Sequence, residues 1–356
     1  MIEKGTSKKI TIIQSFCCVL VIFIHSTGYK YFALDDSTFG FLTKLFLDFF
    51  TDWLPQISVS FFFIISGFLF FKDFNEKKLK SKDISFDFEN YKKKLLNRFF
   101  TIVIPYFICN LVWLLFNMLI QQFPFIMNNI TSLPMYDWNI DSFIKGIVFG
   151  EFAGITWYLR YLIIFFLLSP LIWIFIVKSK VTCILALLLT FILSTNLHYD
   201  LSRFNSLFFF TLGAFICLKG KKYLSYKYSD KQILIAFIIN FICILAYSVL
   251  VEDSWFSCVI RIIHIVSLWI SFDKINSNGL ILFSKFSMFI YLYHGQTQQC
   301  INKIFQIFLS NFHLQWLMAI INTFGGVFIT VLVLMVLGSI FEKKCNQFWK
   351  LLVGFR

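Results

Sequence analysis

Long apolar stretches alternate with short polar connections along all 356 residues of the chain. Ten of them approach the roughly 20 residues that a helix needs to cross a bilayer, and they span 10–28, 53–71, 99–120, 157–178, 181–197, 205–219, 232–251, 255–272, 281–299 and 316–341. The pattern predicts an all-α, polytopic bundle of about ten transmembrane helices, in one integral membrane domain over residues 1–356. For the segment 300–315 two alternatives stay open, an outer loop and an interfacial helix.

Composition supports lipid as the surrounding solvent. Hydrophobic residues make up 58% of the chain and charged residues only 14%, whereas soluble domains carry about 25% charged residues. Most of the nine cysteines fall inside apolar stretches without CxxC spacing, so we expect buried small side chains rather than disulfides or a metal site. These cysteines are Cys17, Cys18, Cys109, Cys183, Cys217, Cys243 and Cys258.

The net charge of +13 is distributed in a way that argues against a nucleic-acid partner, which would require a basic face on a soluble domain. Instead, 24 Lys and Arg residues lie in one alternate set of connections and 5 in the other. Because Lys and Arg mark cytoplasmic loops, we expect both termini in the cytoplasm. The basic connection from Lys77 to Arg98 could also attract phosphates, although the topology rule alone accounts for its charge.

Five ionisable side chains on four predicted helices should lie toward the non-cytoplasmic side. Ionisable groups at membrane depth are costly and usually functional, and these are His25, Arg160, Arg261, His264 and His294. Each also has a structural explanation: His25 and Arg160 could lie at the interface, and Arg261 with His264 could pair helices. His198 and His313 fall in outer connections and are expected at the surface.

These groups suit proton transfer. A histidine can take the proton from a hydroxyl that attacks an acyl carbon, while an arginine or second histidine stabilises the developing charge. The sequence contains no HExxH motif, nucleophile elbow, P-loop or dinucleotide fingerprint.

Six sequence blocks resemble, in order, the membrane-bound acyltransferase family 3, the integral membrane O-acyltransferases of bacterial surface polysaccharides. The blocks are QSFCCVLVIFIHST (Gln14 to Thr27), SFFFIISGFLF (Ser60 to Phe70), RFFTIVIPYF (Arg98 to Phe107), TWYLRYLIIFFLLSPLI (Thr156 to Ile172), FFFTLGAFI (Phe208 to Ile216) and SKFSMFIYLYHG (Ser284 to Gly295). Many members have Arg where this chain has Gln14, which places it in a divergent subgroup.

The resemblance implies a multi-pass enzyme of the bacterial plasma membrane. It would transfer an acyl group, commonly acetyl from acetyl-CoA, to a hydroxyl of a cell-surface or lipid-linked glycan. It implies His25 as catalytic base, an acyl-CoA co-substrate and no bound cofactor or metal. Residues expected to contact substrate are Glu151, Trp157, Arg160, Arg261, His264, Tyr291, His294 and, with the alternative of a packing role, Ser66.

Two rival functions remain. An exporter of a glycan or lipid-linked sugar would need no acyl chemistry, and its typical inverted halves with broken helices are not evident in the sequence. A receptor or scaffold would explain the membrane spans but not the converging ionisable groups.

Overall fold

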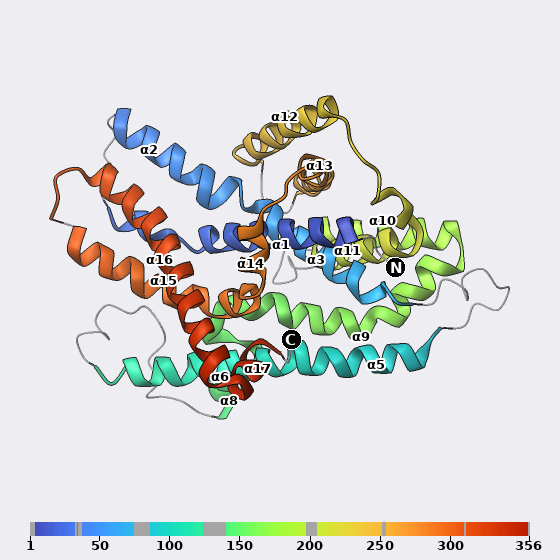
Figure 1. Cartoon of the computed structure of the whole chain (residues 1–356), viewed down its shortest axis with the longest axis horizontal. Coiled ribbons are helices and arrows are strands. Elements are labelled where there is room, and N and C mark those ends of the chain that lie inside the picture. The colour runs from blue at the N-terminus through green and yellow to red at the C-terminus, as the bar shows by residue number, and fades with distance from the viewer. Residues whose placement is uncertain are drawn as a thin grey trace.

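The computed structural model of the chain consists of helices and connections, with no strand in the parts that it describes (Figure 1). Those parts are residues 4–32, 34, 38–74, 86–123, 140–196, 205–250, 254–309 and 311–354. The predicted all-α bundle is therefore confirmed, while the side of the membrane on which the termini lie stays a prediction. His198 and residues 77–85 of the basic connection that starts at Lys77 lie outside the described residues.

Each of the ten predicted apolar stretches lies largely within a helix. The helices are α1 (Lys4–Ile24), α3 (Gln56–Phe71), α6 (Ile104–Ile120), α9 (Trp157–Lys178), α10 (Lys180–Asn196), α11 (Asn205–Phe215), α12 (Asp230–Tyr247), α13 (Trp255–Ser271), α15 (Ser287–Leu309) and α16 (Gln315–Lys344). Among the described residues, six helical stretches are long and apolar enough to cross a membrane. The chain is thus a multi-pass membrane protein.

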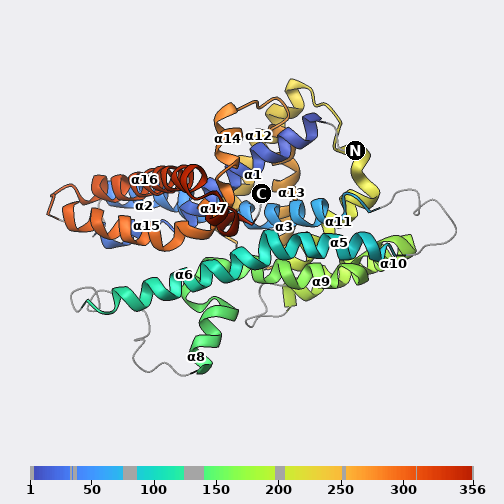
Figure 2. The same cartoon turned by 60° about the horizontal axis from the view of Figure 1, so that its bottom comes forward.

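Several helices extend beyond the predicted boundaries. α2 (Thr38–Asp48) runs through the π-helical turn η2 (Phe49–Trp53) toward α3, and α5 (Phe88–Arg98) runs through η3 (Phe99–Val103) into α6. In Figures 1 and 2, α5 and α6 follow one another along one side of the molecule. The ambiguous segment 300–315 is mostly helix, because α15 continues to Leu309.

Short elements complete the described chain between and after the long helices. η1 (Thr27–Tyr31) follows α1, and α8 (Ile140–Ile144), η5 (Lys145–Phe149) and η6 (Glu151–Thr156) precede α9. The remaining elements are η8 (Ile216–Gly220), η9 (Lys221–Tyr223), α14 (Asn278–Ser284) and α17 (Asn346–Val353).

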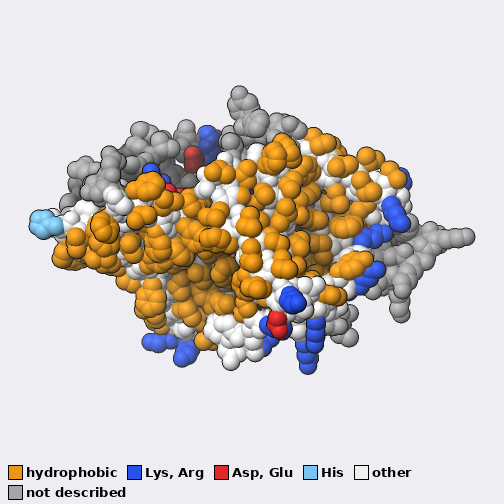
Figure 3. Space-filling model, turned by 90° about the horizontal axis from the view of Figure 1, so that it is seen from above, with side chains coloured by type: hydrophobic (Ala, Val, Ile, Leu, Met, Phe, Trp, Pro, Cys, Tyr) orange, Lys and Arg blue, Asp and Glu red, His pale blue; other side chains and the backbone are white. Residues whose placement is uncertain are grey.

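The outer surface carries the apolar side chains that a lipid environment requires. Figure 3 shows hydrophobic side chains over most of one face, with Lys and Arg gathered toward its edges. On α10 alone, six large apolar side chains are more than half exposed: Val181, Ile184, Leu185, Leu188, Leu189 and Ile192. A continuous apolar surface of this kind would be unstable in water, and it is stable against acyl chains.

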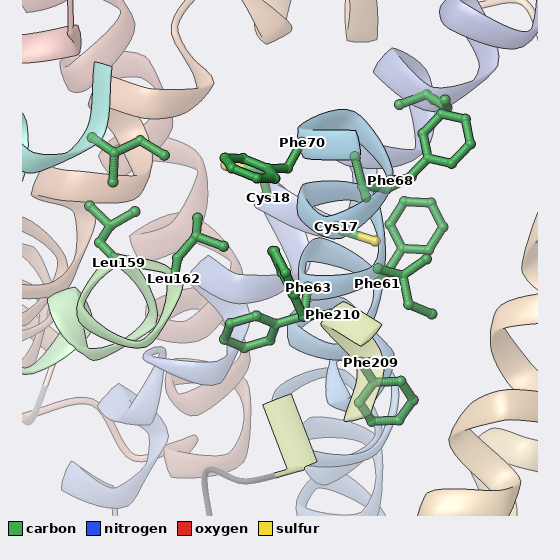
Figure 4. Close-up of a cluster of buried hydrophobic side chains, with 14 of the residues drawn as sticks. Cys17, Cys18, Phe61, Phe63, Phe68, Phe70, Leu159, Leu162, Phe209 and Phe210 are labelled. Atoms are coloured by element: carbon green, nitrogen blue, oxygen red, sulfur yellow. The ribbon is translucent and has the colours of Figure 1, made fainter. Parts of the chain in front are cut away.

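The interior is a phenylalanine-rich core in which α1, α3, α9 and α11 meet (Figure 4). Two glycines bring α3 and α11 into backbone contact. A Cβ on Gly67 would collide with the carbonyl of Phe210, and a Cβ on Gly213 with the carbonyl of Ile64. Membrane helices pack most closely where such small residues face each other. The seven cysteines predicted to be buried are indeed buried.

A buried ion pair holds the start of α1 to the end of α13. Lys9 Nζ lies 2.9 Å from Asp273 Oδ1 and 4.4 Å from the ring centroid of Trp269. The other carboxylate oxygen of Asp273 accepts the backbone N–H of Tyr228 at 3.1 Å. The charge of Lys9 is thereby compensated where α1 is packed among other helices.

Candidate active site

His25 and His294 come from distant parts of the chain and lie in ring-to-ring contact. α1 ends at Ile24, and His25 follows in a turn in which its backbone N–H donates to the carbonyl of Ile22 at 3.2 Å. His294 lies in the first half of α15. The centroids of the two imidazole rings are 5.1 Å apart, and the ring planes meet at 53°. Two predicted site residues, both capable of proton transfer, therefore lie next to each other.

The surroundings of His294 fix which of its nitrogens carries the proton. Its Nδ1 lies 2.8 Å from the carbonyl oxygen of Tyr291 and 3.1 Å from that of Ile290. Carbonyl oxygens only accept hydrogen bonds, so Nδ1 is the protonated nitrogen and Nε2 carries the lone pair. This Nε2 is buried and has no hydrogen-bond partner among the described residues. His294 therefore presents an unoccupied acceptor, while the partly exposed His25 remains within reach of a substrate.

Tyr291, Tyr158 and Ser66 extend the histidine pair into a continuous set of contacts. The hydroxyl of Tyr291 donates to the carbonyl of Ile155 at 2.6 Å, and its ring lies 6.1 Å from the ring of His294. Tyr158 packs edge-on against Tyr291 with centroids 5.7 Å apart, and its hydroxyl is 2.8 Å from Ser66 Oγ. Residues of α3, η6, α9 and α15 thus form one polar and aromatic lining next to the histidines.

Comparison with known protein families decides between the rival classes. A model of the acyltransferase domain of family 3 matches residues 8–339, which is nearly the whole chain. The chain belongs to the membrane acyltransferase family 3. A search of curated proteins finds no significant match to it, and neither does a search of solved structures. The protein is thus an acyltransferase, and the resemblance found in its sequence is confirmed.

Trp157 and Glu151 are the first residues of two elements that contribute to this lining, α9 and η6. The ring of Trp157 packs against those of Phe63 and Tyr161, with both centroid distances 6.3 Å. Glu151 is exposed at the start of η6, the same segment whose Ile155 carbonyl holds Tyr291. A direct contact of either side chain with substrate stays a prediction.

Arg160 interacts with the segment that precedes α9. Its guanidinium donates to the carbonyl of Phe149 at 2.9 Å and lies over the rings of Phe149 and Tyr161. These contacts orient the end of η5. A role of Arg160 in substrate binding stays a prediction.

The described contacts of Arg261 and His264 are with α3 and α12, whereas His25 and His294 lie at the end of α1 and on α15. Arg261 donates to Gln56 Oε1 at 3.0 Å, at the start of α3. His264 Nδ1 lies 3.1 Å from the hydroxyl of Tyr247 on α12. Next to it, Ser267, Ser271 and Asn240 are hydrogen-bonded across the same α12–α13 interface. The structure thus places His264 in a polar helix interface, one of the two alternatives open from the sequence.

Sequence reasoning missed one aromatic residue and several amides near the pair. Tyr158 stands directly after Trp157, but only the fold shows that it bridges Ser66 and Tyr291. On α15, Gln298 and Asn302 follow His294 at intervals of four and are buried. That spacing places side chains on one helix face, so the sequence could have indicated that these amides lie in line with His294. No group of three or more His, Cys, Asp or Glu in the described ranges is arranged to hold a metal ion.

Proposed function

We propose that this acyltransferase moves an acyl group, acetyl from acetyl-CoA in the simplest case, to a hydroxyl of a cell-surface or lipid-linked polysaccharide. The enzyme would work in the bacterial plasma membrane, with both termini in the cytoplasm. The observation that carries the proposal is the contact between His25 and His294 within a family 3 acyltransferase. Two imidazoles 5.1 Å apart in a lipid-embedded fold need a functional explanation, because ionisable groups at this depth are costly.

His25 is the base in this proposal. As the acceptor hydroxyl attacks the carbonyl carbon of the thioester, the imidazole of His25 takes the hydroxyl proton. The tetrahedral intermediate then collapses, the carbon–sulfur bond breaks, and the proton passes from His25 to the departing CoA sulfur. The products are an ester and free CoA, and His25 is neutral again.

His294 orients and supports the base. Its Nδ1 proton is held by backbone carbonyls, so Nε2 is the nitrogen left to accept a hydrogen bond, and the ring of His25 lies in contact with this imidazole. A neutral acceptor beside His25 stabilises the imidazolium that forms during proton transfer. Tyr291 and Tyr158 supply the adjacent wall against which the acceptor lies.

The test compares His25→Ala with His313→Ala, a matched change of an exposed histidine. Membrane levels of both variants are measured first, and surface and intracellular glycan are then analysed by mass spectrometry. We expect acyl mass on the glycan with His313→Ala and its loss with His25→Ala. Normal acylation in cells with His25→Ala, with or without glycan retained inside the cell, would refute His25 as base.

A further inference from the structure

A row of amide side chains continues from His294 along α15. Gln298, Asn302 and Gln306 follow at intervals of four residues, which keeps them on one helix face. At 1.5 Å rise per residue the row extends roughly 18 Å from the histidine. His294, Gln298 and Asn302 are buried and Gln306 is partly exposed. The row therefore leads from the histidine pair toward the protein surface, and we call it the amide row.

The amide row is poorly satisfied by the protein itself. Both polar atoms of the Gln298 side chain lack a hydrogen-bond partner in the described part of the chain, although this residue is 0% exposed. The same holds for Oδ1 of Asn302, Oε1 of Gln306 and Nε2 of His294. Buried polar groups are nearly always hydrogen-bonded, so a contiguous set of exceptions indicates missing partners.

The opposite wall of the row is formed by η1 and α16. Asn322 of α16 donates to the backbone carbonyl of Asn302 at 3.1 Å, and its own Oδ1 has no described partner. A Cβ on Gly28 would collide with the side chains of both asparagines, and one on Gly326 with Asn302 Oδ1. The backbones of η1 and α16 thus approach the amides directly. Because Gly28 follows His25 by three residues, the base and the amide row border the same interface.

We infer that the amide row binds hydroxyl groups of the polysaccharide acceptor and guides one of them to His25; this rests on the proposed function. An amide both donates and accepts hydrogen bonds, as a sugar hydroxyl does. The three amides carry no charge, so the row suits a neutral polyhydroxylated chain better than a phosphate or carboxylate. An acceptor that enters between α15 and the η1–α16 wall would supply the partners that the closed interface lacks.

The variant Gln298→Met tests this, because methionine has a similar length and no hydrogen-bonding group. Its control is Gln299→Met, the same change at the neighbouring exposed position. De-O-acylated surface polysaccharide from the host is titrated onto purified protein in nanodiscs, and binding is followed by microscale thermophoresis. We expect Gln298→Met to raise the Kd for polysaccharide, and the acceptor KM, roughly tenfold to hundredfold with kcat nearly unchanged. Gln299→Met should match the wild type.

Thermal stability separates binding from a structural role. Since the Gln298 amide has no described protein partner, Gln298→Met should leave the melting temperature unchanged or raise it. An unchanged Kd, or a lower melting temperature with normal Kd, would overturn the inference.

The outcomes also separate this inference from the proposed function. His25→Ala should still bind the polysaccharide. If the wild type binds it and Gln298→Met does not, but no protein transfers acyl groups to it, the amide row stands and the proposed function fails. If the wild type transfers acyl groups but does not bind this polysaccharide, the inference on the amide row is wrong.

Discussion

The contact between α3 and α11 offers a quantitative test of the fold. In Gly67→Ala the added methyl group would meet the carbonyl of Phe210, a backbone group that cannot rotate away. A carbon and a carbonyl oxygen need about 3.3–3.6 Å between them, so the two helices must separate by about 1.2–1.5 Å. Forcing an extra methyl into a packed interior costs about 1–3 kcal/mol. We expect the apparent melting temperature to fall by roughly 2–10 °C.

The buried thiols provide the assay. A maleimide dye that fluoresces on reaction with thiols reports the unfolding of detergent-purified protein, because seven described cysteines are buried and only Cys300 and Cys345 are exposed. The control is Gly5→Ala, whose new methyl group would have nothing within 4 Å. Gly213→Ala should act in the same direction as Gly67→Ala. The double variant should cost less than the two separate losses together, because one displacement relieves both collisions. A Gly67→Ala protein as stable as Gly5→Ala would refute the backbone contact.

Two further predictions concern polar contacts. Ser66→Ala removes the 2.8 Å hydrogen bond between Ser66 and Tyr158 and should lower acyl transfer by about tenfold, a loss of roughly 1.4 kcal/mol. Tyr158→Phe also removes the 3.3 Å hydrogen bond that the Tyr158 hydroxyl donates to the carbonyl of Phe62, so it should lower acyl transfer at least as much. Steady-state kinetics should show the double variant no slower than Tyr158→Phe alone, and additive losses would contradict a shared bond. Burial raises the pKa of the Asp273 carboxyl, but hydrogen bonds from Lys9 and the backbone N–H of Tyr228 outweigh it and hold the pKa below its usual value. The stability contributed by this carboxylate is therefore present above the unfolded pKa of about 3.9 and is lost as pH falls through the folded pKa. Asp273→Asn should destabilise the protein at neutral pH and flatten its acid melting profile, and an unchanged pH profile would argue against the ion pair.

Apolar length was sufficient to predict the helices but not all of their ends. α2 and α5 were missed because Asp48 and the stretch from Glu89 to Arg98 interrupt the apolar pattern, although their backbones continue helically into α3 and α6. Residues 300–309 were ambiguous because they are rich in polar side chains. In the fold, the buried side chain of Asn302 faces α16 instead of water.

Only the part of the candidate site that follows from the membrane topology could be predicted from the sequence. The resemblance and the polarity pattern selected His25 and His294, and the structure places them in contact. The same reasoning grouped Arg261 and His264 with them, whereas their described contacts lead to Gln56 and Tyr247. Depth in a bilayer can be estimated from sequence, but the direction in which each helix faces its neighbours depends on packing.

The bonded Nδ1 of His294 limits how a proton can move through this ring. An imidazole conducts protons only when one nitrogen can take up a proton while the other releases one. At His294 the releasing nitrogen faces only the carbonyls of Ile290 and Tyr291, which do not accept protons. In this orientation the ring therefore exchanges a proton only at Nε2, so His294 can support proton transfer on the side of that nitrogen and does not relay a proton onward through Nδ1.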